Sequence, residues 1–222
     1  MTSFIIKIIA VLTMVLDHIK YALPCTNGIL TEYFGRISFP LFAFLVTEGY
    51  IHTKNLKKYC LRLLIFGIIS QIPFMFFRSL VGEWKMLNIM FTMFLGIMAI
   101  FAYNKIDKKY ISIPIVILIA TLGEIIRVDY GAYGVLTVFI IYFLKNKKIL
   151  LPIVYGAFVF VYYYSMLKEW IIVMPYVLYP FCTWLSSLIM VLYNGKQGKN
   201  VKYFFYGFYP IHMIVVYLIS LI

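Results

Sequence analysis

Residues Ile5–Tyr21, IIKIIAVLTMVLDHIKY, form an apolar run that carries an acid and a histidine side by side near its end. A helix that spans a lipid bilayer needs about 20 largely apolar residues. An ionisable group inside such a helix costs several kcal/mol and usually marks a functional site. We therefore expect Asp17 and His18 to serve a function, unless both lie at the level of the lipid headgroups, where charge is tolerated.

The composition of the whole chain is that of a membrane protein. Hydrophobic residues make up 64% of its 222 residues and charged residues 13%, and the mean hydropathy is +0.95. A water-soluble domain of this size needs a more polar exterior. The sequence therefore predicts an all-α, multi-pass protein of the cell membrane, a bacterial inner membrane or a plasma membrane, with the lipid bilayer as a partner.

Nine apolar segments, separated by charged or turn-forming residues, predict a single domain, residues 1–222, built as a bundle of about nine transmembrane helices. The segments are Phe4–Leu23, Phe34–Ile51, Tyr59–Phe77, Leu87–Tyr103, Ile111–Ile126, Gly131–Leu144, Ile149–Leu167, Trp170–Tyr193 and Tyr203–Ile222. The fifth and sixth segments are short. For these two, a re-entrant piece is an alternative to a full span.

Basic residues are distributed unevenly among the connections between these segments. The even-numbered connections hold thirteen basic residues against one acid, Asp107, whereas the odd-numbered ones hold five basic and five acidic residues. The thirteen are Lys54, Lys57, Lys58, Arg62, Lys105, Lys108, Lys109, Lys145, Lys147, Lys148, Lys196, Lys199 and Lys202. By the positive-inside rule the even connections are cytoplasmic, the N-terminus is inside and the C-terminus is outside. The net charge of +12 is thus a topology signal, and no nucleic-acid partner is expected.

The cysteines provide no structural framework. Cys25, Cys60 and Cys182 are scattered, odd in number and without the spacing of metal ligands. We therefore expect neither a disulfide nor a metal site.

Asp17 and His18 point about 100° apart, because an α-helix has 3.6 residues per turn. Asp17 continues a face of small residues, Ala10 and Thr13, which suits close packing against another helix. Its partner is expected on that other helix, and Arg36 is the nearest candidate. A buried Asp–Arg pair that only holds helices together is the alternative to a catalytic role.

His18 is the candidate general base. Imidazole titrates near neutral pH and can take a proton from an attacking amine or hydroxyl. The predicted orientation places the pair in the outer half of the membrane, because the first helix runs outward. The candidate catalytic residues are therefore His18, with Asp17 and Arg36 beside it.

The stretch Gly35–Gly49, GRISFPLFAFLVTEG, is predicted to place Arg36 and Glu48 in one helix. Pro40 is expected to bend that helix, because proline removes a backbone donor. Glu48 would lie near the inner face. Glu48 either has a functional role there or only extends toward the inner membrane surface.

Two other stretches combine polar residues with helix-breaking ones. Asp129–Leu136, DYGAYGVL, begins a helix with an acid and two glycines, for which capping of the helix by Asp129 is the simpler explanation. Tyr206–His212, YGFYPIH, sets a histidine two residues after Pro210. A polar pocket and plain packing are equally good explanations of His212.

Four segments of the sequence resemble the TraX family, which is named for the membrane protein that acetylates the N-terminus of conjugative pilin. They are KIIAVLTMVLDHIKY, FGRISFPLFAFLVTEGYIHTKNLKKYCLRLLIFGIISQIPF, DYGAYGVL and KYFFYGFYPIHMIVVYL. The first and second are also distantly similar to the lysosomal heparan glucosaminide acetyltransferases. Lys20 departs from the family pattern, which places glycine there, and would narrow the outer end of any cavity.

The resemblance implies a transmembrane acetyltransferase that takes its acetyl group from cytosolic acetyl-CoA. The acceptor would be an amine or hydroxyl of a peptide N-terminus, a sugar or a small molecule. Asp17, His18, Arg36, Glu48 and His212 fall on family motif positions. The residues expected to bind the donor are Glu48, His52, Lys57, Lys58 and His212, and those expected to bind the acceptor are Arg127, Asp129 and Tyr130. The basic stretch from Lys54 to Arg62 would attract the phosphates of acetyl-CoA.

Two other classes of function use the same features. A proton-coupled transporter or binding protein could use buried ionisable groups as a proton relay, and internal inverted repeats would favour it. A scaffold or assembly protein without chemistry is the third class. Clustered charges in the outer half of the membrane argue against it only modestly.

Overall fold

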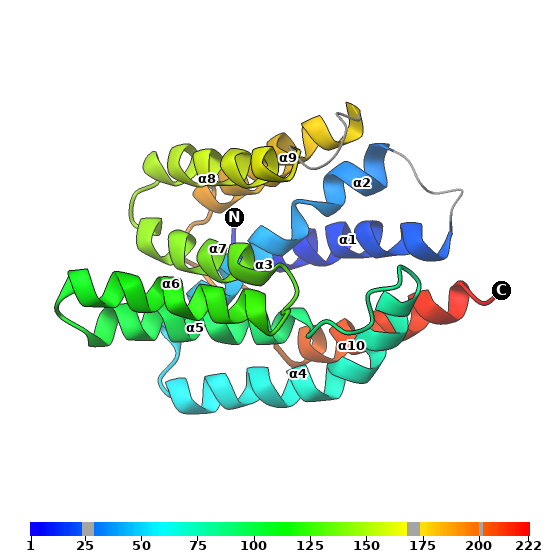
Figure 1. Cartoon of the computed structure of the whole chain (residues 1–222), viewed down its shortest axis with the longest axis horizontal. Helices are drawn as coiled ribbons and strands as arrows, with labels where there is room; N and C mark the ends of the chain where they lie inside the picture. The colour runs from blue at the N-terminus through cyan, green and yellow to red at the C-terminus, as the bar shows by residue number, and fades with distance from the viewer. Residues whose placement is uncertain (24–28, 168–173, 200–201) are drawn as a thin grey trace. The chain divides into compact units, whose positions relative to one another are not determined.

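The computed structural model describes the chain apart from residues 24–28, 168–173 and 200–201, and the described part contains ten α-helices (Figure 1). The helices are α1 (Ser3–Ala22), α2 (Ile29–Gly35), α3 (Ser38–His52), α4 (Leu56–Ser79), α5 (Ile89–Lys105), α6 (Lys109–Ile125), α7 (Gly131–Leu144), α8 (Leu150–Leu167), α9 (Met174–Val191) and α10 (Lys202–Ile219). Within the described residues the one trace of β-structure is a parallel bridge between Leu87 and Val128. The predicted all-helical class is confirmed.

The nine predicted segments coincide with nine of these helices, and the sixth has the same bounds as α7. The difference lies in the second segment, Phe34–Ile51. There the chain forms the short helix α2 and the longer helix α3, with Arg36 and Ile37 between them. Cys25, Lys168 and Glu169, which entered the cysteine and charge arguments, lie outside the described residues, as does the predicted helix start at Trp170.

Polar side chains fix where several helices begin. Thr2 accepts a hydrogen bond from the backbone N–H of Ile5, and Asn55 accepts one from Lys58. Such N-caps satisfy backbone donors that have no partner within the helix. Because Asn55 caps α4, the basic residues that follow it are helical rather than part of a loop.

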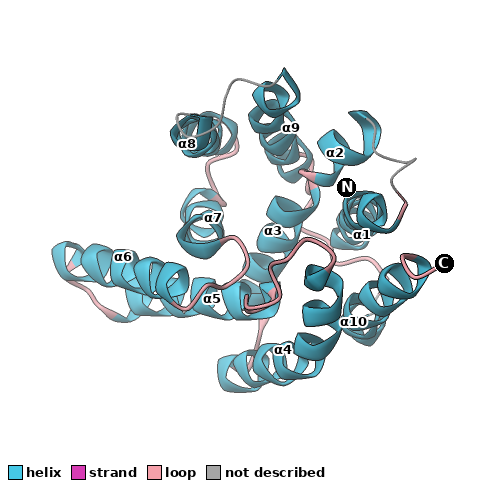
Figure 2. Cartoon of the chain, turned by 45° about the vertical axis from the view of Figure 1, so that its right-hand side comes forward, coloured by secondary structure: helices cyan, strands magenta, loops and turns pink. Residues whose placement is uncertain are grey.

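The described chain divides into two compact units. Unit 1 contains residues Met1–Leu45 and Phe143–Val201. In it α1 packs against α2, α2 against α9, and α8 against α9 (Figure 2). The predicted small-residue face of α1 is buried: Ala10 has no exposed surface, and its carbonyl accepts a hydrogen bond from Ser38 Oγ at 2.9 Å. This contact ties α1 to the start of α3.

Unit 2 contains residues Val46–Tyr142 and Lys202–Ile222. Here α5 and α6 form an antiparallel pair, while α4 packs against both α5 and α10 (Figures 1 and 2). One core cluster is built around Leu95, Ala99 and Val135, and another around Tyr59, Leu63 and Ile97.

A neutral polar network lies inside unit 2. Asn88 is fully buried, and its side-chain amide donates to Gly67 O at 2.7 Å and to Gln71 Oε1 at 2.9 Å. Its carbonyl oxygen accepts from Met90 N at 3.0 Å, which starts α5, and Gln71 Nε2 donates to Met86 O. All these polar groups are paired within the network. It therefore fixes the loop before α5 against α4.

The surface of the chain has the features of a membrane protein. Large apolar side chains project outward along several helices; Ile68 of α4, Leu118 of α6 and Val161 of α8 are each more than 60% exposed. By length and composition, α4 alone among the described helices meets the criteria for a bilayer-crossing helix. Shorter apolar helices occupy Ile89–Lys105, Gly131–Leu144, Leu150–Ser165, Leu178–Val191 and Phe204–Ile219.

Candidate functional site

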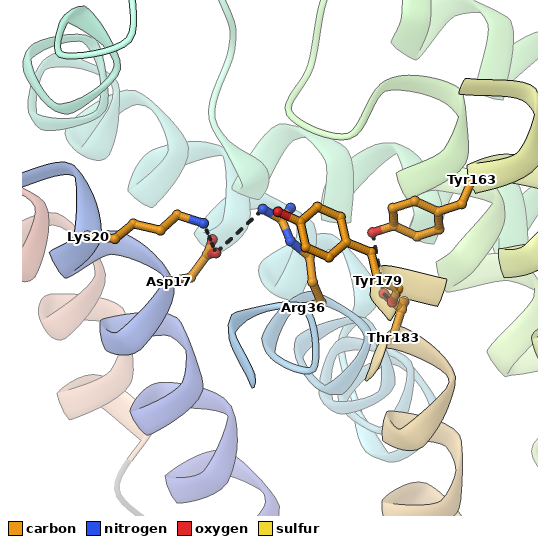
Figure 3. Close-up of polar contacts among 6 residues, drawn as sticks. All are labelled: Asp17, Lys20, Arg36, Tyr163, Tyr179 and Thr183. Carbon is orange, nitrogen blue, oxygen red and sulfur yellow. Dashed lines mark hydrogen bonds and ion pairs between the residues drawn. The ribbon is translucent and has the colours of Figure 1, made fainter. Parts of the chain in front are cut away.

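Asp17 is the centre of a buried ion cluster in unit 1. Lys20 Nζ donates to Asp17 Oδ1 at 3.0 Å, and Arg36 Nη2 lies 3.7 Å from the same oxygen (Figure 3). The side chains of Lys20, Asp17 and Arg36 are 6%, 14% and 22% exposed. Two cations and one carboxylate leave this cluster with one excess positive charge.

The cluster forms because three features of the chain coincide. Lys20 follows Asp17 by three residues, the spacing at which helical side chains are neighbours. Arg36 lies in the two-residue break between α2 and α3. Gly35 lets the backbone approach α1 closely, because a Cβ atom there would come within 2.5 Å of Asp17 Oδ1. The predicted pairing of Asp17 with Arg36 is therefore confirmed.

Aromatic rings hold the other side of Arg36. Its guanidinium lies 4.7 Å from the ring centroid of Tyr179 on α9, and Tyr179 makes edge contacts with Tyr33 at 5.8 Å and Tyr163 at 6.2 Å. Thr183 Oγ1 in turn lies 3.3 Å from the hydroxyl of Tyr163 (Figure 3). A cation over an aromatic face is attracted to it. Arg36 is thus held in place from α1 and from α9.

His18 lies on the adjacent face of α1 and is half-buried. Because Asp17 is engaged by two cations, its carboxylate serves as a fixed negative charge rather than as a proton acceptor. The excess positive charge of the cluster suits a reaction in which an oxygen atom gains negative charge.

Glu48 and His52 lie one turn apart at the end of α3, in unit 2. His52 Nδ1 is 2.9 Å from Glu48 O and 3.6 Å from Glu48 Oε2. The Glu48 side chain is 15% exposed and that of His52 65%. This pair is therefore open to solvent on the histidine side.

The turn between α6 and α7 presents the three residues predicted to bind the acceptor. Arg127 and Tyr130 have positive φ angles, 56° and 64°, and the backbone of Leu87 pairs with both Arg127 and Asp129. Glu124 Oε2 accepts from Ala132 N at 2.8 Å, so Glu124 caps the first turn of α7. Arg127 is exposed, whereas Asp129 and Tyr130 are half-buried.

His212 is buried in α10, with 6% of its surface exposed. Its Nδ1 donates to Phe208 O at 3.0 Å, and its ring stacks on Phe208 with centroids 5.3 Å apart. Lys57 and Lys58 are exposed near the start of α4. In the described residues no group of three or more His, Cys, Asp or Glu side chains is placed to hold a metal ion.

Comparison with known proteins shows the family of this chain. The model of the family described as "TraX protein" matches residues 3–220 of the 222. The chain belongs to the TraX family. One TraX-like relative is the "Probable fimbrial assembly protein FimC, serogroup H1" of Dichelobacter nodosus, which is 26% identical over 97% of this chain and 94% of its own length. No solved structure matches the chain.

Three expectations about this TraX protein need correction. Arg36 and Glu48 do not share a helix, because the chain breaks at Arg36 before α3 begins at Ser38. Pro40 therefore lies in the first turn of α3, where a missing N–H is tolerated, rather than at a bend in mid-helix. The stretch from Leu56 to Arg62 is helical, so its lysines are presented from α4 and not from a loop.

Sequence patterns did not reveal two of the residues that contact Asp17 or Arg36. Lys20 was expected to narrow a cavity, yet it is a partner of Asp17; the spacing of three between the two residues is a signal that could have shown this. Tyr179 gave no signal, because it is one of 20 tyrosines in the chain. Its contact with Arg36 depends on how α9 packs.

Proposed function

We propose that this TraX protein is an integral membrane acetyltransferase. It would move an acetyl group from cytosolic acetyl-CoA to an amine or hydroxyl acceptor at the outer half of the membrane. The observation that carries the proposal is the buried Asp17–Lys20–Arg36 cluster with His18 beside it, on the helix that bears the family motif. Ionisable groups in such an apolar setting are costly to keep, and function is the usual reason for them.

The chemistry assigned to unit 1 is a single acyl transfer. The lone pair of the acceptor attacks the thioester carbonyl carbon, the C–S bond breaks, and CoA leaves as a thiolate. His18 takes the proton of the acceptor and returns it to the departing sulfur, as a general base and then a general acid. Arg36, oriented by Asp17 and Tyr179, stabilises the negative charge that develops on the carbonyl oxygen.

Donor binding is assigned to Glu48, His52, Lys57, Lys58 and His212, and acceptor binding to Arg127, Asp129 and Tyr130. The exposed ammonium groups of Lys57 and Lys58 would attract the phosphates of the donor through solvent. Such attraction weakens with salt. The lysine pair Lys57→Ala/Lys58→Ala should therefore weaken the apparent affinity for acetyl-CoA more at low than at high ionic strength.

The proposal includes a topology of about nine spans with the N-terminus in the cytoplasm. Its support is the match between nine apolar segments and nine helices, together with the charge difference between the connections. A cysteine introduced beside Lys108 should be protected from an impermeant thiol reagent in intact cells, while one beside Glu83 should react. Labelling of the Lys108 site from outside would contradict the orientation.

The family's resemblance to a pilin acetylase suggests the first acceptor to test, the N-terminal amine of a pilus subunit, and the fimbrial-assembly name of the Dichelobacter nodosus relative is in keeping with it. Full-length protein purified in detergent would be incubated with acetyl-CoA and a pilin N-terminal peptide, a hexosamine or a small amine. We expect release of free CoA together with a mass increase of one acetyl group on one acceptor. Lys108→Gln serves as the control, because it changes an exposed cation outside both assigned sites.

The same protein reconstituted in proteoliposomes distinguishes the acetyltransferase from the alternative function, a proton-coupled transporter. Proton-coupled uptake of solute without CoA release would replace the acetyltransferase by a transporter that uses the same buried groups. CoA release with acetylated acceptor, lost in His18→Gln, would support the acetyltransferase instead.

A further inference from the structure

Arg62 is the one half-buried arginine of the described chain that no acid or hydrogen-bond acceptor of that chain engages. Arg36 pairs with Asp17, and Arg78 pairs with Glu83. Arg127 is exposed, so water can satisfy it. The Nε atom of Arg62 is buried without a hydrogen-bond partner, as is that of Arg78. Unlike Arg78, Arg62 makes no ion pair with an acid of the described residues.

The surroundings of Arg62 hold its guanidinium but do not neutralise it. The guanidinium lies over the ring of Tyr59, 5.6 Å from the ring centroid, and Tyr59 is itself fixed by a hydrogen bond from its hydroxyl to Val46 O at 3.2 Å. One turn further along α4, Phe66 stacks on Tyr206 of α10 at 4.6 Å. An arginine placed on an aromatic face keeps the donors along its edge for an anion that accepts two hydrogen bonds, such as a carboxylate or a phosphate.

The charged residues that flank Arg62 along the chain are basic. Lys57 and Lys58 precede it by five and four residues, so all three cations lie within two turns of α4. No acidic residue occurs between Glu48 and Glu83, and Glu48 lies beside His52 instead. Like charges one turn apart on a helix repel each other. An anion bound between the cations would relieve this repulsion.

We propose that Arg62, backed by Tyr59 and flanked by Lys58, is a phosphate-binding site on unit 2. Arginine binds phosphate through two parallel hydrogen bonds, whereas a lysine contributes a point charge. The phosphate can belong to a soluble nucleotide-type ligand such as CoA or to the headgroup of an anionic lipid. With CoA as its ligand, the site rests on the donor binding proposed above for Lys57 and Lys58. Binding of the anion itself does not require acetyl transfer.

Thermal unfolding of the full-length protein in detergent tests the site, with CoA as the probe and pantetheine as its phosphate-free counterpart. CoA should raise the unfolding temperature of the wild type and pantetheine should not. Arg62→Gln should weaken the apparent affinity for CoA by about tenfold, as expected for loss of one charge-assisted contact. The affinity of Arg62→Lys for CoA should lie between those of the wild type and Arg62→Gln, because lysine keeps the positive charge but cannot make two parallel hydrogen bonds.

The lipid arm of the test uses nanodiscs of phosphatidylglycerol and of phosphatidylcholine. If the wild type responds to phosphatidylglycerol but not to CoA, and Arg62→Gln loses this response, the site is confirmed with a lipid headgroup as its ligand. Lys108→Gln is the matched control for net charge and should behave as the wild type.

Equal responses of Arg62→Gln and the wild type to both probes would overturn the proposal. So would an equal loss in Lys108→Gln, which would reduce the effect to general surface charge. If Arg62→Gln does not fold, Arg62→Lys decides the matter, and an affinity unchanged from the wild type would overturn the phosphate fork. None of these readouts requires turnover, so the acetyltransferase proposal and the phosphate site can fail separately.

Discussion

Units 1 and 2 keep polar groups inside apolar helices in two different ways. Unit 1 buries ions: one carboxylate between two cations, with Arg36 also resting on Tyr179. Unit 2 buries neutral amides, and the side chains of Asn88 and Gln71 pair with each other and with nearby backbone. A buried ion pair is often no more stabilising than apolar residues of the same shape. The amides brace a loop, whereas under the proposed function the ions would act on a bound molecule.

The largest expected effect tests the functional side of this comparison. His18→Ala in unit 1 should lower acetyl-transfer turnover by about 10²–10⁴-fold, the contribution of a general base, while leaving expression and acetyl-CoA binding intact. Turnover would be measured as CoA release by the detergent-purified protein.

His212→Ala in unit 2 is the counterpart, because it removes a histidine that packs on Phe208. Loss of turnover in His212→Ala but not in His18→Ala would exchange the two assignments. If neither variant loses turnover, the base would be a carboxylate, Asp17 or Glu48.

The next effect concerns the cost of leaving buried ions unbalanced. Asp17→Ala leaves Lys20 and Arg36 without their shared anion and should destabilise the protein by about 3–5 kcal/mol. Glu83→Ala removes the partner of Arg78 at an exposed position, where Glu83 is 55% exposed, and should cost about 0–1 kcal/mol. Thermal unfolding in detergent would compare the two. Equal losses of stability in the two variants would mean that Asp17 stabilises the protein no more than the exposed Glu83 does.

Substitution in the amide network of unit 2 should lower stability and leave turnover unchanged, whereas His18→Ala should lower turnover alone. Asn88→Ala leaves Gly67 O, Met90 N and the Gln71 side chain without their partner, at a cost of about 1–3 kcal/mol. Turnover per folded molecule should stay at the wild-type level. A variant that unfolds at the wild-type temperature but loses turnover would place Asn88 in the active site and remove the contrast between the units.

The smallest effects come from two glycines, one in each unit. Gly35→Ala would push a Cβ against Asp17, within 2.5 Å of Oδ1 and 2.6 Å of its Cβ, and should destabilise the protein by about 1–3 kcal/mol. Gly207 on α10 has no atom within 4 Å of such a Cβ, so Gly207→Ala should stabilise by about 0.5–1 kcal/mol through helix propensity. The unfolding temperatures of the two variants in detergent would measure both effects. A stabilising Gly35→Ala would show that α1 and α2 separate freely.

Much of the helix pattern was predictable because each helix is an apolar run between charged or capping residues. The predicted bounds of α7 are correct to the residue. The break at Arg36 was not predictable, because Phe34–Ile51 is largely apolar, and its interruption depends on two successive turns at Arg36 and Ile37. Hydrophobicity alone carries no information about such turns.

The sequence predicted a contact of the candidate site where a residue had few possible partners in the chain. Asp17 is one of eight acids, so its pairing with Arg36 could be predicted from the orientation of neighbouring helices. Tyr179, Asn88 and Arg62 could not be predicted in this way. Their roles depend on which of many aromatic or polar residues the packing brings next to them, and no local pattern records that.

The bridge between Leu87 and Val128 has a consequence for proteolysis of the purified protein. A protease must draw the scissile segment into an extended strand, which a braced turn resists. Arg127 is exposed, but its backbone N–H donates to Glu124 O and its carbonyl accepts from Leu87 N. Lys85 lies in an exposed segment before the bridge. Trypsin should therefore cleave after Lys85 well before it cleaves after Arg127, although both bonds carry a suitable basic residue.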